Sequence, residues 1–125
     1  MASGKGIIVL DEDTSVLGAL KRVLKTHGFD VEVFDTVRGF LGSPRLSDAS
    51  CLVLDIDLNG TSGIELKRQL TSAGVSVPVI FITGANKEAN RQAALKAGCV
   101  AYLEKPFPSS DLIEAIEKIG AVLPP

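Results

Sequence analysis

Hydrophobic and polar positions along the chain form two alternating kinds of segment. Short, uninterrupted hydrophobic runs recur five times, and each is followed by a stretch in which hydrophobic residues return every three or four positions. A continuous run predicts a strand covered on both faces, and the longer period predicts an amphipathic helix. The expected strands are Ile7–Leu10, Val31–Phe34, Leu52–Asp55, Val79–Ile82 and Val100–Leu103.

The expected helices follow the strands one by one. In the first, hydrophobic residues form one stripe, Asp13 or Thr14 can cap its start, and His27-Gly28 ends it. The fourth is rich in alanine and has Leu95 as its only large hydrophobic residue, so we expect it to be loosely held. The remaining helices are expected around residues 37–41, 63–70 and 109–119.

This alternation predicts one α/β domain over residues 1–125, with its core at about 6–122. The fold class is a (βα)5, doubly wound, five-stranded parallel sheet with right-handed crossovers. Ligands of such folds bind beyond the carboxyl ends of the strands, where the strand order reverses. We therefore look for chemistry directly after each strand.

Composition and charge narrow the function classes. The 125 residues are 46% hydrophobic and 22% charged, which is enough for a core without disulfide or metal support. A formal net charge of −2 argues against direct nucleic-acid binding by this domain. There is no run long enough to span a membrane and no signal peptide, so we expect a cytoplasmic protein without membrane contact. Cys51 and Cys99 have no metal-ligand spacing and are expected to be small buried hydrophobic residues.

Polar side chains gather where four of the expected strands end. They are Asp11, Glu12 and Asp13 at the first, Asp55 and Asp57 at the third, Thr83 and Gly84 at the fourth, and Glu104 and Lys105 at the fifth. Taken singly, each has a structural explanation: the first acids can cap a helix, the threonine can bond its own backbone, and the lysine can be a surface charge. Taken together, they predict a site at one edge of the sheet.

Asp55 is the hardest of these residues to explain structurally. A carboxylate that ends a hydrophobic strand costs several kcal/mol to desolvate unless it is paired or bound to a metal. If three or more carboxylates fold onto one rim, a divalent cation relieves their repulsion, and oxygen ligands alone favour Mg²⁺. The Thr83 hydroxyl, Lys105 and the Gly84 amide would complete a clamp for a phosphoryl group, which suggests phosphoryl transfer onto an aspartate.

Four motifs at these positions carry a family resemblance: VLDED, LDIDLNGTSG, FITGA and EKPF. With them the chain resembles a response-regulator receiver domain of two-component signalling, in the chemotaxis-regulator-like superfamily, from Ile7 to about Val122. Each motif is weak alone, but four in this order are specific. The resemblance implies a flavodoxin-like fold with strand order 2-1-3-4-5.

The resemblance also implies roles for the acidic residues. Asp55 would be the phospho-acceptor, and Asp11 and Glu12 would match the paired acids that bind Mg²⁺. Asp57 would offer its backbone carbonyl to the metal. Glu12 departs from the commoner aspartate, and Asn59 stands where a proline is usual. The Asp57 side chain lies next to the phosphoryl site, so we expect a competent site with unusual dephosphorylation kinetics.

The remaining implied roles concern switching. Thr83 would contact the phosphoryl group, Lys105 would pair with Asp55 or the phosphate, and the Lys105–Pro106 bond would be cis. Tyr102 matches an aromatic switch position that turns inward when Thr83 moves. A sensor histidine kinase or phosphotransfer protein would supply the phosphoryl group. The face formed by helix 4, strand 5 and helix 5 would control an output module, a partner protein or a phosphorylation-dependent homodimer.

Two other interpretations remain open at this point. The segment LVLDIDLNGT also resembles the nucleophile motif of haloacid-dehalogenase-like phosphatases, in which Asp57 would be a general acid. Those enzymes carry the motif on their first strand, whereas here it is on the third. A degenerate receiver that only binds partners is the second alternative. The sequence also leaves open whether the domain acts alone or within a longer protein.

Overall fold

The five predicted strands form one parallel sheet in the computed structural model, which describes residues 6–85 and 87–122. Its order, β2-β1-β3-β6-β7, is the predicted 2-1-3-4-5 once the two short strands β4 and β5 are set aside. The central strands β3 and β6 are buried along their whole length, which explains their continuous hydrophobic runs. The strands are β1 (Gly6–Leu10), β2 (Asp30–Phe34), β3 (Cys51–Asp55), β6 (Val79–Thr83) and β7 (Ala101–Glu104).

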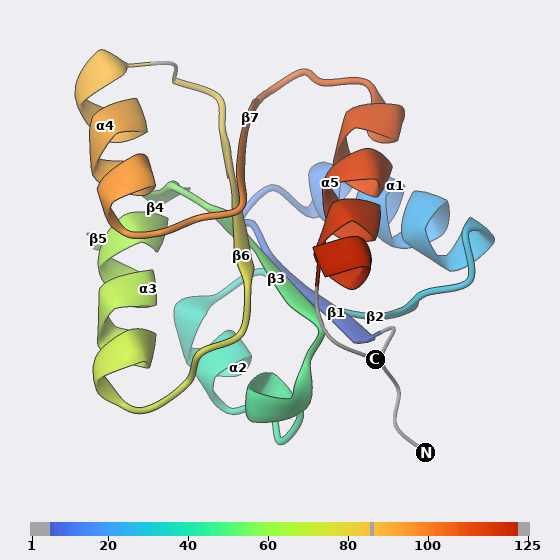
Figure 1. Cartoon of the computed structure of the whole chain (residues 1–125), viewed down its shortest axis with the longest axis horizontal. Coiled ribbons are helices and arrows are strands. Elements are labelled where there is room, and N and C mark those ends of the chain that lie inside the picture. Colours follow the sequence, from blue (N-terminus) through green and yellow to red (C-terminus); the bar gives the residue numbers. More distant parts are fainter. Residues whose placement is uncertain (1–5, 86, 123–125) are drawn as a thin grey trace.

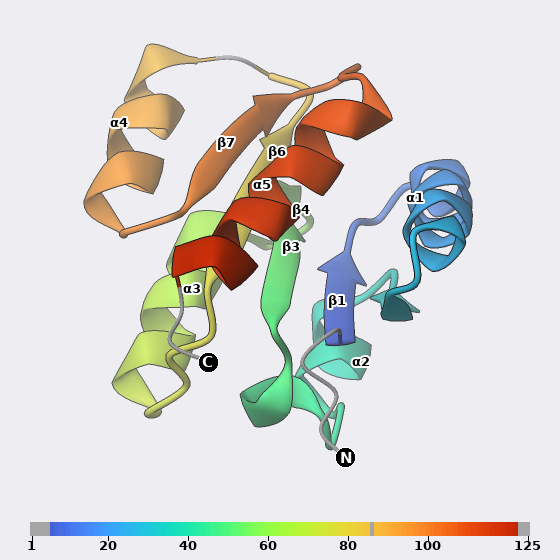
Figure 2. The ribbon, with the colours of Figure 1, turned by 45° about the vertical axis from the view of Figure 1, so that its right-hand side comes forward.

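Helices cover both faces of this sheet (Figure 1). The helices α1 and α5 pack on one face, and α2, α3 and α4 pack on the other, as the turned view also shows (Figure 2). Within the described residues, no helix is both long and apolar enough to cross a membrane. The helices are α1 (Thr14–Thr26), α2 (Val37–Leu41), α3 (Gly63–Ser72), α4 (Glu88–Lys96) and α5 (Ser109–Val122).

The core lies in two layers because side chains alternate between the faces of each strand. In β1, Ile8 and Leu10 join the layer under α2, α3 and α4, whereas Ile7 and Val9 join the layer under α1 and α5. Cys51 lies in the second layer and is fully buried, as predicted. The same prediction is wrong for Cys99, which is only half-buried in the turn between α4 and β7.

Helix α1 begins and ends at the residues that the sequence predicts, because each end has a residue suited to that position. The carboxylate of Asp13 accepts hydrogen bonds from the backbone amides of Ser15 and Val16, so Asp13 rather than Thr14 is the cap. At the other end, Nδ1 of His27 lies 3.0 Å from the carbonyl oxygen of Val23. The next residue, Gly28, has a φ of 88°, which favours glycine and ends the helix.

Helix α4 has few anchoring contacts, which agrees with the expectation of a loosely held helix. Lys87, the cap residue just before its start, makes no side-chain capping hydrogen bond, and Ala94 is the one buried residue of the helix. Leu95 does not anchor the helix, because 54% of its surface is exposed. Two further elements were not predicted: a 3₁₀ helix at Leu46–Asp48, and a hairpin of β4 (Asp57–Leu58) and β5 (Thr61–Ser62).

Candidate functional site

Three of the predicted site residues meet at the carboxyl edge of the sheet. Asp11 after β1 and Asp55 at the end of β3 are 1% and 4% exposed, and the side chains of both contact Lys105 after β7. The Nζ atom of Lys105 lies 2.8 Å from Oδ2 of Asp11 and 3.4 Å from Oδ2 of Asp55. One ammonium group therefore stands between two buried carboxylates that come from different strands.

Burial is the main influence on the pKa of the Asp55 carboxyl group. It raises the pKa of Asp55 to about 6, and the nearby carboxylate of Asp11 acts in the same direction. The backbone amide of Asp57, which donates to Oδ1 of Asp55 at 2.9 Å, and the charge of Lys105 oppose that rise. Burial alone would lower the pKa of Lys105, but the two carboxylates outweigh it and raise the pKa. Asp55 is thus a carboxylate whose charge is weakly compensated.

The side chain of Asp57 turns to a different part of the same edge. Its Oδ2 accepts hydrogen bonds from the Thr83 hydroxyl at 2.8 Å and from the Gly84 amide at 3.2 Å. The Thr83 side chain is buried, whereas Asp57 itself is exposed. A position of the Asp57 side chain near the proposed phosphoryl site was predicted, but its hydrogen bonds with Thr83 and Gly84 were not. The signal was present, because a second acid stands two residues after the strand-end Asp55.

Glu12 does not join the other acids. Its Oε2 accepts a hydrogen bond of 2.6 Å from the backbone amide of Asn59, in the two-residue turn that joins β4 to β5. Gly60, the second residue of that turn, has a φ of 80°, where glycine is favoured. In residues 6–85 and 87–122, no three acidic, histidine or cysteine side chains lie close enough to hold a metal ion. The expectation that three or more carboxylates share one pocket is therefore wrong for this structure.

The two carboxylates that do converge still fit a small divalent cation. Mg²⁺ is commonly held by one or two carboxylates together with water and phosphate oxygens, not by a complete cage of side chains. Oδ2 of Asp11 is buried and has no hydrogen-bond donor in good geometry, although Lys105 approaches it. An oxygen-only donor set with a spare buried acceptor is suited to a hard cation.

Gly63 permits the backbone of Asp55 to lie directly against the start of α3. A Cβ atom at this position would overlap the carbonyl oxygen of Asp55, so only glycine fits without a shift of the backbone. The amide of Gly63 also donates to the carbonyl of Ile56 at 3.1 Å. A helix start near this glycine was predicted, but its close approach to Asp55 was not. The close approach brings the start of α3 directly against the end of β3.

Tyr102 lies on β7 among the residues that pack under α4. Its hydroxyl oxygen is buried and has no hydrogen-bond partner, and the guanidinium carbon of Arg91 lies 5.7 Å from the centre of its ring. This contact joins α4 to β7, and the sequence analysis did not foresee it. The Lys105–Pro106 bond is cis, as the resemblance implied.

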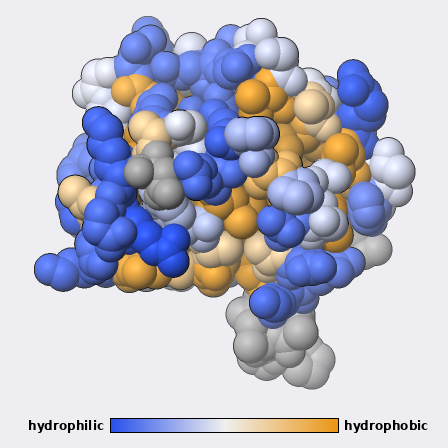
Figure 3. All heavy atoms as spheres, turned by 90° about the horizontal axis from the view of Figure 1, so that it is seen from above, coloured by the Kyte–Doolittle hydropathy of each residue, from blue (hydrophilic) through white to orange (hydrophobic). Residues whose placement is uncertain are grey.

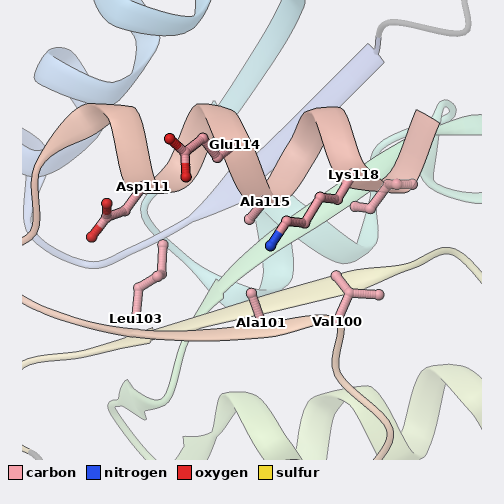
Figure 4. Close-up of a pocket in the computed structure, with 8 residues that line it drawn as sticks. Val100, Ala101, Leu103, Asp111, Glu114, Ala115 and Lys118 are labelled. Carbon is pink, nitrogen blue, oxygen red and sulfur yellow. The ribbon is translucent and has the colours of Figure 1, made fainter. Parts of the chain in front are cut away.

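The surface above this edge is mixed in character. Seen from above, hydrophilic residues surround smaller hydrophobic areas (Figure 3). A separate pocket of about 620 Å³ lies at the side of the molecule, between β7 and α5 (Figure 4). Ala101 and Leu103 of β7 line one wall, and Asp111, Glu114 and Lys118 line the other. This pocket contains none of the predicted site residues.

Comparisons with known proteins agree with the fold and the residue pattern. The chain is 37% identical over 110 residues to the response regulator protein TodT of Pseudomonas putida, covering 88% of this chain and 48% of TodT. It is therefore about half as long as the curated relatives it matches. Among solved structures, a CheY-like receiver domain protein of Methanospirillum hungatei has a TM-score of 0.84 at 30% identity, covering 95% of this chain and 96% of that one.

The crystal structure of FixJ-N is equally similar, with a TM-score of 0.84 at 31% identity, and covers 100% of this chain and 99% of that one. These likenesses favour a receiver over the phosphatase interpretation, because the acid motif stands on the third strand of a receiver-type sheet. The family model described as the response regulator receiver domain matches residues 7–117. The chain therefore belongs to the receiver domains of two-component response regulators.

Proposed function

We propose that Asp55 accepts a phosphoryl group from a histidine kinase or a phosphotransfer protein, with Mg²⁺ bound at Asp11 and Asp55. The observation that supports this most directly is the position of Asp55 at the end of the central strand, with its carboxylate between Asp11 and Lys105. The negative charge of the Asp55 carboxylate is only partly balanced by Lys105, and buried ionisable groups of this kind are often found at functional sites. We also propose that the chain folds as one receiver domain with its core at 6–122.

In the transfer step, an oxygen of the Asp55 carboxylate attacks the phosphorus of a phosphohistidine. The new P–O bond forms as the P–N bond breaks, and the imidazole ring takes back the electron pair of that bond. The product is an acyl phosphate, and no proton has to leave Asp55. Because the carboxylate attacks in its ionised form, a pKa of about 6 leaves it mostly competent at neutral pH.

The neighbouring residues supply positive charge and hydrogen-bond donors. Bound Mg²⁺ would neutralise charge on the phosphoryl oxygens, and the Asp57 backbone carbonyl would serve as a further oxygen ligand. Lys105 pairs with Asp55 before transfer and with a phosphoryl oxygen after it. The Thr83 hydroxyl and the Gly84 amide, both at the end of β6, donate to the remaining oxygens. Glu12, whose Oε2 accepts a hydrogen bond from the Asn59 amide, would be a further oxygen ligand, directly or through water, if it released that amide.

The proposed output face consists of α4, β7 and α5. Three large hydrophobic side chains are exposed among the described residues, and two of them, Leu95 at 54% and Val100 at 51%, lie at α4 and just before β7. Movement of Thr83 toward the phosphoryl group would be followed by Tyr102 and, through Arg91, by the weakly anchored α4. The partner is an output module of a longer protein, a separate protein or a second copy. The names of FixJ and TdiR, both transcriptional regulatory proteins, favour an output module.

Mass spectrometry after incubation with acetyl phosphate and Mg²⁺ tests the proposal. The expected result is one acid-labile phosphoryl group per chain in the wild type and none in Asp55→Asn. Labelling that survives in Asp55→Asn would contradict the assignment of the acceptor. The degenerate binding module would be supported instead if the wild-type chain is not labelled and its intrinsic fluorescence or NMR spectrum does not respond to Mg²⁺.

A further inference from the structure

The carboxylate of Asp57 lies where a phosphoryl group on Asp55 would need its donors. Its Oδ2 accepts hydrogen bonds from the Thr83 hydroxyl at 2.8 Å and the Gly84 amide at 3.2 Å. In the proposed function, the same hydroxyl and amide donate to phosphoryl oxygens. A hydroxyl has one proton to donate, so it cannot serve both anions at full strength. The two negative groups therefore compete for one pair of donors.

The local backbone holds Asp57 in this position. Its own amide donates to Oδ1 of Asp55 at 2.9 Å, so the backbone of Asp57 is fixed by the proposed acceptor itself. In the β4–β5 turn, directly after the β4 strand that carries Asp57, the backbone amide of Asn59 donates a hydrogen bond of 2.6 Å to Glu12. Two hydrogen bonds thus orient the strand that carries the Asp57 side chain. That side chain is exposed, and it can swing into water when another anion takes the donors.

The Thr83 hydroxyl has two acceptors within hydrogen-bond distance, the Asp57 carboxylate and the carbonyl of Ala85, and their distances can be compared. The carbonyl oxygen of Ala85 lies 3.1 Å away, and the amide of Ala85 donates to the hydroxyl at 3.1 Å. The contact with Asp57 is shorter and involves a charged acceptor, and charge-assisted hydrogen bonds are about twice as strong as neutral ones. The hydroxyl is therefore directed mainly to Asp57.

We propose that the Asp57 carboxylate is an internal substitute for the phosphoryl group. In the unphosphorylated chain it holds the Thr83 hydroxyl and the Gly84 amide, and it must leave before these donors bind phosphoryl oxygens. This inference rests on the proposed role of Asp55 as acceptor. Asp57 is a positioning residue in this scheme, since it takes no part in bond formation. Its effect is to weaken binding of the phosphoryl group while it keeps Thr83 directed at the site beforehand.

Simple charge repulsion by a solvated Asp57 is the competing explanation, and the two differ before any phosphoryl group is present. If Asp57 only repels, its removal leaves the Gly84 amide and the Thr83 hydroxyl unchanged in the free protein. If Asp57 occupies the donors, its removal breaks the hydrogen bond to the Gly84 amide. The amide proton resonance of Gly84 then moves upfield without metal or phosphate.

The experiment uses Asp57→Ala and Asp57→Asn, with Asp35→Asn as the matched control. Asp35 is also an exposed acid at the carboxyl edge of the sheet, directly after β2, and no hydrogen bond or ion pair of the described residues joins its side chain to Asp55, Thr83 or Lys105. Amide spectra are recorded first without Mg²⁺. Binding of beryllofluoride at saturating Mg²⁺ is then titrated by the same resonances. This phosphoryl mimic is a reasonable probe because a DrrB receiver domain 26% identical to this chain is BeF3-activated.

The expected result has two parts. The Gly84 amide shifts upfield in Asp57→Ala, by less in Asp57→Asn, and does not move in Asp35→Asn. Beryllofluoride binds about three- to tenfold more tightly to Asp57→Ala than to the wild type, which corresponds to about one hydrogen bond. Two results would overturn the proposal that the Asp57 carboxylate occupies the donors of the phosphoryl group. One is an unchanged Gly84 resonance in Asp57→Ala, and the other is an equal gain in beryllofluoride affinity in Asp35→Asn.

The proposed function fails in a different way. If beryllofluoride binds neither the wild type nor any Asp57 variant, and acetyl phosphate labels none of them, Asp55 is not an acceptor and both proposals are rejected. If all of them bind and are labelled equally, the acceptor role stands and only the inference about Asp57 is rejected.

Discussion

Asp55 and Asp11 bring two carboxylates into a buried position with one ammonium group to compensate them. At the scale of single residues, burying these two carboxylates lowers the free energy of unfolding. Burial disfavours the charged form of Asp55, and Asp11 adds repulsion. The cost depends on pH, because it exists only when Asp55 has lost its proton.

The pH dependence of stability has a definite sign here. Folding raises the pKa of Asp55 from 3.8 to about 6, so the folded state binds the proton more tightly than the unfolded state. The corresponding stability is fully present below pH 3.8 and is lost as the pH rises through 6. Asp55→Asn keeps the neutral form, so at pH 7 without Mg²⁺ we expect it to gain about 1–2 kcal/mol relative to the wild type.

Urea unfolding in EDTA at pH 4 and pH 7 measures this effect. The difference between Asp55→Asn and the wild type should be larger at pH 7 than at pH 4, and Asp35→Asn should show no such change. A difference that does not depend on pH would contradict the stated origin of the cost. Adding Mg²⁺ should stabilise the wild type more than Asp55→Asn.

At the scale of elements, the start of α3 is set directly on the end of β3. Gly63 makes this possible because a Cβ atom there would overlap the carbonyl of Asp55. Helix α1 offers the opposite case. Gly18 lies within that helix and a Cβ atom on it would meet nothing within 4 Å.

These two glycines give a matched prediction. Gly63→Ala should destabilise the fold by about 2–4 kcal/mol, because backbone atoms must move apart. Gly18→Ala should stabilise it by up to about 1 kcal/mol, because alanine loses less backbone freedom in a helix. Chemical unfolding of both variants gives the two signs. If Gly63→Ala were as stable as Gly18→Ala, the close contact between α3 and Asp55 would not exist in solution.

At the scale of the whole molecule, the carboxyl edge is connected to α4 through the sheet. Thr83 and Glu104 are paired in register between β6 and β7, and Tyr102 lies two residues before Glu104. The ring of Tyr102 packs under the guanidinium group of Arg91 in α4. A change at Asp55, the proposed acceptor, therefore has a short physical route to the proposed output face.

The composition offers a direct measurement of this route. Tyr102 is the one tyrosine of the chain, and there is no tryptophan, so tyrosine emission reports on this side chain alone. We expect acetyl phosphate with Mg²⁺ to change that emission in the wild type and not in Asp55→Asn. A phosphorylated chain with unchanged emission would show that Tyr102 does not respond to Asp55.

Sequence patterns predicted the large elements and their succession along the chain, because continuous runs and helical periods directly express burial, whereas the strand order within the sheet came from the family resemblance. They also predicted which residues stand at the carboxyl edge, since strand ends are easy to locate. They did not predict which way Glu12 and Asp57 point, because side-chain direction depends on partners that only the folded backbone provides. The hairpin β4–β5 was missed because its strands have two residues each, too few to show a period.

Lys105 follows the last strand of the sheet, whereas the two carboxylates it compensates come from the first and the third. During synthesis, Asp11 and Asp55 leave the ribosome well before their counter-charge. A partly made chain that buries both acids must do so without that partner, which makes early collapse of this edge unfavourable. Assembly of this buried cluster is thus tied to completion of the sheet, and contacts distant in sequence of this kind are associated with slow folding.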